Sequence, residues 1–188
     1  KRTKKRVLGG DKTIVCVARL DIKQKRQDLL IDAFIEISHK YPYYSLCLYG
    51  DGLNDDEVIL REKATGYPNV KFMGPTTDVV EVIQNATMFV LSSDFEGIPN
   101  ALLESMSIGV PSVSTDCSPG GAAMLIRNKE NGLLVPKGDV KALATAMEFI
   151  ITHPAESERM AIQATEVNEL YAETEIAGKW ESFLTKLK

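Results

Sequence analysis

Two glutamates, Glu96 and Glu104, stand eight residues apart in a segment that could bind a polyhydroxylated ligand. The apolar run 87–91 before them predicts a buried strand, and residues 100–108 after them predict a helix. Pro99 suits the first helical turn, because its missing N–H would have no partner there. Glu96 then lies in a strand-to-helix loop, and Glu104 about one turn inside the helix. Such loops build the ligand crevice of a parallel sheet, so both carboxylates could accept hydrogen bonds from ligand hydroxyls.

Cationic side chains follow the first predicted strand, residues 13–18. Arg19 closes that strand, and Lys25 is predicted to begin the next helix. A helix N-terminus with cations beside it is a place where a phosphate binds. Taken alone, a solvated charged loop is the simpler interpretation of these residues.

Three glycine-containing segments follow other predicted strands. Gly50-Asp51-Gly52 is not a dinucleotide fingerprint, because it lacks the third glycine and follows the wrong strand. A tight turn is the simpler interpretation, and the loop could still border the crevice. In Val70-Lys71-Phe72-Met73-Gly74 the backbone could contact a base edge, although phenylalanine is more often a core residue. Gly120-Gly121 could present N–H groups to a phosphate or sugar oxygen, or form a plain turn.

The composition argues against several function classes. The 188 residues are 44% hydrophobic and 26% charged with a formal net charge of −4, which favours neither nucleic acid nor an anionic membrane. Cys16, Cys47 and Cys117 lack metal-ligand spacing, and the first two are interpreted as core thiols of a reducing compartment. His39 and His153 lie far apart in the sequence, which argues against a zinc site. Without a visible signal peptide or membrane-spanning run, the chain is predicted to be cytoplasmic.

Strands and helices alternate along the chain. Strands are predicted at 13–18, 45–49, 69–73, 87–91, 110–114 and 132–135, and helices at 28–39, 55–64, 78–84, 100–108, 120–126, 139–151, 155–171 and 173–187. This alternation predicts an α/β fold: a Rossmann-like, doubly wound parallel sheet of about six strands, with helices on both faces and a helical C-terminal segment. Asn54 and Asp139 are candidate N-caps. Residues 1–12 are interpreted as a basic linker, with a phosphate-binding patch as the alternative, and residues 13–188 as one domain.

Taken together and in this order, these segments resemble the carboxyl-terminal, donor-binding domain of a GT-B fold glycosyltransferase of the GT4 family. The resemblance covers about residues 12–186. It rests on five groups of residues: Arg19-Leu20 with Lys25; Gly50-Asp51-Gly52; Val70-Lys71-Phe72-Met73-Gly74; Glu96 and Glu104 with Gly109-Val110-Pro111; and Asn131-Gly132-Leu133-Leu134-Val135-Pro136 with Asp139 and Leu143-Ala144.

The resemblance implies a role for each matched residue. Arg19 and Lys25 would hold the donor diphosphate. Glu96 would bind hydroxyls of the transferred sugar, and Glu104 the ribose hydroxyls. The other implied donor-binding residues present backbone groups or flank the nucleotide: Gly50, Phe72, Met73, Gly97, Ile98, Pro99 and Asn100.

The resemblance also implies the reaction and its partners. Members are retaining transferases that need no bound metal or cofactor, and a UDP-sugar is the first choice of donor. The expected activity is hexosyl transfer to a glycan or lipid-linked acceptor in capsule, surface polysaccharide or glycolipid synthesis, with no part for nucleic acid. The acceptor-binding domain, with any peripheral membrane contact, would be absent, which leaves this chain inactive alone. The last helix, with Trp180, resembles the segment that crosses back to that domain, so its exposed face would invite self-association.

Three positions depart from the family pattern. Arg26 stands where glycine usually follows the lysine, in a loop one residue longer than usual; Met124 aligns with a frequent acidic residue; and Ser105 replaces a frequent alanine. Two other functions stay open. One is a non-catalytic sugar-nucleotide-binding or partner-docking module. The other is a nicotinamide- or phosphate-binding Rossmann domain, against which the missing glycine fingerprint argues.

Overall fold

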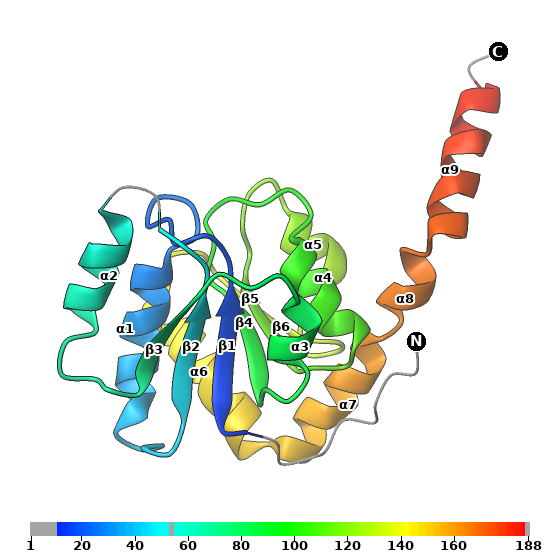
Figure 1. Cartoon of the computed structure of the whole chain (residues 1–188). Helices are drawn as coiled ribbons and strands as arrows, with labels where there is room; N and C mark the ends of the chain where they lie inside the picture. Colours follow the sequence, from blue (N-terminus) through cyan, green and yellow to red (C-terminus); the bar gives the residue numbers. More distant parts are fainter. Residues whose placement is uncertain (1–10, 53–54, 187–188) are drawn as a thin grey trace.

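The computed structural model describes residues 11–52 and 55–186, so most of the predicted basic linker and the candidate cap Asn54 lie outside the described residues. Figure 1 shows a sheet wrapped by helices, with the last helix projecting away from this body. The strands are β1 (Thr13–Val17), β2 (Ser45–Tyr49), β3 (Val70–Gly74), β4 (Met88–Leu91), β5 (Ser112–Thr115) and β6 (Leu133–Val135). The helices are α1 (Gln27–Ser38), α2 (Asp56–Lys63), α3 (Val79–Ile83), α4 (Asn100–Ser107), α5 (Gly121–Leu125), α6 (Val140–Thr152), α7 (Pro154–Ala164), α8 (Val167–Leu170) and α9 (Glu173–Lys186).

The six strands form one sheet in the order β3-β2-β1-β4-β5-β6, and every pair of neighbours is parallel. The predicted six-stranded, doubly wound α/β fold is therefore confirmed. The strand order reverses between β1 and β4, so the loops after these two strands diverge and leave a crevice at the carboxyl edge of the sheet. That edge is the upper one in Figure 1.

Each face of the sheet is covered by its own apolar cluster. Alternate residues of β1 divide between the clusters, with Ile14 and Cys16 on one face and Val15 on the other. The first cluster joins the sheet to α1, α2 and α6, and includes the fully buried Phe34. The second joins it to α3, α4, α5 and α8, and includes Leu102 of α4. Helix α4, which carries Glu104, is thereby packed against the sheet.

Local sequence signals explain where several helices begin and end. The Asp139 carboxylate accepts a hydrogen bond from the Ala142 N–H at 2.9 Å, which confirms the predicted cap of α6. The single helix predicted over 155–171 is wrong, because the structure forms α7 and α8 with a turn between them. There the Thr165 hydroxyl donates to the Ile162 carbonyl at 2.7 Å, and the Thr165 N–H donates to the same oxygen. These contacts replace the regular helical pattern.

Helix α9 leaves much of its apolar surface uncovered by the described residues. Trp180 is 61% exposed, and Phe183 and Leu184 are each 55% exposed. The Trp180 and Phe183 rings meet edge to face, with centroids 6.1 Å apart. In the described part of the chain, no helix is both long and apolar enough to cross a membrane.

Candidate functional site

A pocket of about 490 Å³ opens between the loops that follow β1 and β4. This is the point where the strand order reverses, at which open α/β sheets bind ligands. Six of the residues predicted from the sequence to form the site line this pocket: Arg19, Lys25, Glu96, Ile98, Pro99 and Asn100. The fold thus brings together the cationic loop and the acidic loop, which lie about seventy residues apart in the sequence.

Lys25 and Glu96 form the central contact of the pocket. The Lys25 ammonium donates to Glu96 Oε1 at 2.7 Å, and the Ser93 hydroxyl donates to the same oxygen at 2.8 Å. Only 17% of the Lys25 side chain and 12% of the Glu96 side chain are exposed. Solvent screens such a pair much less than a surface pair. The pocket therefore offers a cation that can bind phosphate and, 2.7 Å from it, a carboxylate that can bind hydroxyl groups.

The turn that holds Lys25 differs from the sequence prediction. Lys25 does not begin α1; it lies in the preceding turn, and α1 begins at Gln27. The Lys25 N–H donates to the Asp21 carbonyl at 2.7 Å, which closes the turn. Arg26 follows with φ 52° and ψ 41°, a left-handed conformation that cannot be part of a right-handed helix. The helix therefore starts one residue after Arg26.

Arg19 lies at the rim of the pocket and is less enclosed than Lys25. Its side chain is 45% exposed, and its guanidinium donates to the Asp21 carboxylate at 2.7 Å. Burial acts to raise the pKa of Asp21, but the Gln24 N–H and the Arg19 guanidinium together lower that pKa below its usual value. Asp21 is therefore ionised at neutral pH and holds Arg19 at the rim.

Two glycines allow the backbone around the pocket to pack closely. A Cβ on Gly50 would lie 2.0 Å from the carbonyl oxygen of Ala18, so Gly50 positions the end of β1 rather than entering the pocket. A Cβ on Gly121 would lie 1.3 Å from the carbonyl oxygen of Gly97. The start of α5 is thus in direct contact with the loop that carries Glu96, a steric role that the sequence did not reveal.

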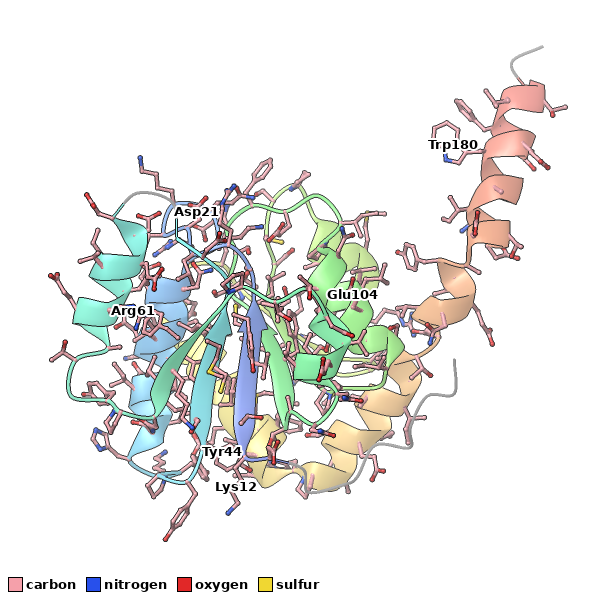
Figure 2. All side chains as sticks on the ribbon, in the orientation of Figure 1. Lys12, Asp21, Tyr44, Arg61, Glu104 and Trp180 are labelled. Atoms are coloured by element: carbon pink, nitrogen blue, oxygen red, sulfur yellow. The ribbon has the colours of Figure 1, made fainter. Side chains whose placement is uncertain are left out.

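Five predicted donor-binding residues are absent from the described lining of the pocket: Gly50, Phe72, Met73, Gly97 and Glu104. Phe72 is partly buried, and the Arg61 guanidinium lies 4.5 Å from its ring centroid, whereas Met73 is 47% exposed. Glu104 lies on α4 (Figure 2). Its Oε2 atom is buried and has no hydrogen-bond partner among the described residues. Burying a carboxylate oxygen without a hydrogen-bond partner costs stability. Glu104 is therefore a candidate for accepting a hydrogen bond from a bound ligand.

The sequence reasoning overlooked Ser93 and Gln24. Ser93 holds Glu96, and the Gln24 side-chain amide lines the pocket and donates to the Phe95 carbonyl at 3.1 Å. The only signal for either residue was its polar type in a loop at the carboxyl end of a strand.

All three cysteines are buried, and burial raises the pKa of the Cys16 thiol to about 12, so Cys16 next to the pocket stays protonated. The described residues contain no cluster of three or more His, Cys, Asp or Glu side chains suited to a metal ion.

Comparison with known proteins identifies the family. The sequence pattern of the family described as Glycosyl transferases group 1 matches residues 11–153. The chain belongs to this family. The match covers β1 through α6, and thus both loops of the pocket.

Individual relatives agree with this assignment. The chain is 28% identical over 175 residues to an uncharacterized glycosyltransferase of Haemophilus influenzae, covering 93% of this chain and 49% of the relative. It is 30% identical over 173 residues to lipopolysaccharide 1,6-galactosyltransferase of Escherichia coli, covering 87% and 46%. The chain spans about half the length of these relatives.

A solved structure shares the fold. Anabaena Alr3699/HepE in complex with UDP superimposes with a TM-score of 0.82 at 24% identity, covering 93% of this chain and 50% of that one. This likeness supports the GT-B fold predicted from the sequence, and the family match supports the predicted glycosyltransferase family.

Proposed function

We propose that this chain is the donor-binding half of a retaining glycosyltransferase that moves a hexose from a nucleoside diphosphate sugar to a glycan or lipid-linked acceptor. The observation that carries the proposal is the pairing of Lys25 with Glu96 in a pocket at the point where the strand order reverses. Lys25 and Arg19 take the diphosphate, and Glu96 takes hydroxyls of the sugar. Glu104 takes the ribose hydroxyls, for which its unpartnered buried oxygen is available.

The proposed roles agree with the charge that develops during transfer. As the bond between the sugar and the phosphate oxygen breaks, negative charge grows on the departing nucleoside diphosphate. Preorganised cations stabilise such charge directly, and losing one donor of this kind costs about 2.7–4 kcal/mol in oxyanion sites. Lys25 is the better placed of the two cations, because its side chain is 17% exposed and that of Arg19 is 45% exposed. We further propose that the reaction needs no bound metal.

The names of two similar proteins support a choice of donor and of product class. Alr3699/HepE was solved with UDP, and the Escherichia coli relative is named lipopolysaccharide 1,6-galactosyltransferase. We therefore propose a UDP-hexose as the donor and a surface polysaccharide or glycolipid as the product. The acceptor would be held mainly by the other half of the enzyme, at the cytoplasmic side of a membrane.

A thermal-shift panel tests the proposed function. The chain is melted with UDP-glucose, GDP-mannose, ADP-glucose or NAD, each in large excess. One sugar nucleotide is expected to raise the melting temperature by about 5–10 °C, because ligand at about 100 times its dissociation constant adds roughly 2.7 kcal/mol of stability. A shift with NAD alone would favour the nicotinamide-binding alternative, and no shift with any of the four would contradict the proposal.

We also propose that the apolar face of α9 is covered by the other half of the enzyme, and that the isolated chain self-associates through it. The face is defined by Ile176, Trp180, Phe183 and Leu184, all of them exposed. Sedimentation velocity over a concentration series is expected to show dimers or larger species, since an exposed apolar face of this kind favours association. Replacing Trp180 with lysine is expected to shift the profile toward monomer. A monomer at every concentration would contradict the proposal.

A further inference from the structure

Arg26 makes contacts that its place in a turn does not require. Its backbone is left-handed, with φ 52°, a conformation that glycine adopts without strain and other residues rarely adopt. Its guanidinium uses all three nitrogens. Nε and Nη2 donate to the Asp28 carboxylate at 3.1 and 3.2 Å, and Nη1 donates to Asp94 Oδ2 at 2.8 Å. A strained position that carries such a side chain points to a functional reason for keeping it.

The contact with Asp94 joins the two loops of the pocket. Arg26 directly follows Lys25, and Asp94 lies two residues before Glu96. Asp28 belongs to the first turn of α1, so the guanidinium connects this helix to the loop after β4. Both Arg26 and Asp94 are partly buried, with 28% and 30% of their side chains exposed. A planar guanidinium can make these three contacts at once, and a lysine ammonium presents no such fork.

The other ion pair between these loops is the one that a donor would disturb. Lys25 pairs with Glu96, yet the proposed function requires Lys25 to bind phosphate and Glu96 to bind sugar hydroxyls. A donor that engages both residues therefore competes with their mutual contact. Arg26 and Asp94 are not among the described residues that line the pocket, so their ion pair can persist when a donor is bound.

We propose that Arg26 is a positioning residue. The two loops are also joined by hydrogen bonds from the Asp94 N–H to the Gln24 carbonyl at 2.9 Å and from the Ser92 hydroxyl to the Lys25 carbonyl at 2.8 Å. Arg26 adds the ion pair with the Asp94 side chain to these contacts, and so helps to set the spacing between the phosphate and sugar positions of the site. This inference rests on the proposed function. It assigns no contact between Arg26 and the donor itself. The spacing matters for a ligand that spans both loops, and it matters less for a nucleotide that lacks the sugar.

The test compares paired ligands by isothermal titration calorimetry: UDP with UDP-glucose, GDP with GDP-mannose, and ADP with ADP-glucose. The measured quantity is the dissociation constant of the sugar nucleotide divided by that of its nucleotide. Arg26→Gly and Asp94→Asn are each expected to raise this ratio by about tenfold, an effect typical of residues in one ion-pair network. The double variant is expected to match Arg26→Gly, because the Asp94 contact is already lost once the guanidinium is gone. Arg26→Lys is expected to raise the ratio less, because it keeps a charge opposite Asp94.

A matched control separates positioning from general loss of an ion pair. Arg127 also pairs with two carboxylates, those of Glu130 and Glu166, and does not line the pocket. Arg127→Gly is expected to leave the ratio unchanged. Arg26→Gly introduces no strain at this φ, and Asp94→Asn decides the test if the glycine variant does not fold.

The possible failures are distinguishable. Unchanged ratios in folded Arg26→Gly and Asp94→Asn, with normal nucleotide binding, would overturn the positioning role and leave the proposed function standing. If none of the three ligand pairs bound the unmodified chain, the proposed function would fail and the positioning role with it.

Discussion

Replacing Lys25 with alanine is expected to weaken UDP binding by about a hundredfold or more, the loss typical of removing one donor from a preorganised anion site. Lys25 is the most enclosed cation of the pocket, with a 17% exposed side chain, so solvent and salt screen its attraction for phosphate weakly. The substitution also leaves Glu96 with the Ser93 hydroxyl as its one side-chain partner within residues 11–52 and 55–186, and the uncompensated carboxylate then repels phosphate. Titration calorimetry with UDP measures the effect.

Lys23→Ala is the matched control for this prediction. Lys23 is an exposed lysine of the same loop and does not line the pocket, so its loss is expected to change the dissociation constant less than about twofold. Arg19→Ala is expected to weaken UDP binding more than Lys23→Ala and less than Lys25→Ala, because the Arg19 side chain is 45% exposed and already paired with Asp21. Equal affinities for the Lys25 and Lys23 variants would refute the assignment of Lys25 to the phosphate.

Gly121→Ala is expected to lower the stability of the fold more than the addition of a methyl group at any other glycine near the site. The new Cβ would lie 1.3 Å from the Gly97 carbonyl oxygen, a backbone atom that cannot rotate away. Either α5 or the loop of Glu96 must move, and overpacking of this kind costs about 1–3 kcal/mol or more. For a chain of this size that loss lowers the melting temperature by about 2–12 °C, which differential scanning calorimetry measures.

The other glycine of this contact provides the control. A Cβ on Gly97 would meet no atom within 4 Å, so Gly97→Ala is expected to melt within about 2 °C of the unmodified chain. The asymmetry is the informative result, because both substitutions add the same methyl group on either side of one contact. Equal melting temperatures for the two variants would show that α5 does not press on the Glu96 loop.

The fold could be predicted from the sequence because its signals are local. Apolar strands and amphipathic helices alternate, and helix α4 was predicted at 100–108 and found at Asn100–Ser107. The helix predicted over 155–171 failed because the side chain of Thr165 competes for a backbone carbonyl, which hydrophobic spacing does not register. Helix α1 was predicted at 28–39 and is found at Gln27–Ser38, but Lys25 lies before it, because the left-handed backbone of Arg26 cannot belong to the helix.

The site could be predicted only in part. The resemblance to a glycosyltransferase domain brought Arg19, Lys25 and Glu96 into one prediction, and the structure places all three in one pocket. The contacts between loops could not be foreseen, because they join residues about seventy positions apart and depend on the order of the strands in the sheet. The contact of Gly121 with Gly97 was missed because it depends on β4 and β5 lying side by side in the sheet. The roles of Arg19, Lys25 and Glu96 in donor binding stay predictions, as do those of Phe72, Met73, Glu104 and the other residues of the predicted site.

The projecting position of α9 has a practical consequence for spectroscopy. Trp180 is the only tryptophan of the chain, and it lies on this helix with 61% of its surface in water (Figure 2). Indole emission from this protein therefore reports the surroundings of α9 and is insensitive to events in the pocket. A shift of that emission to shorter wavelength on mixing with another polypeptide would mark the docking of α9 without any added label.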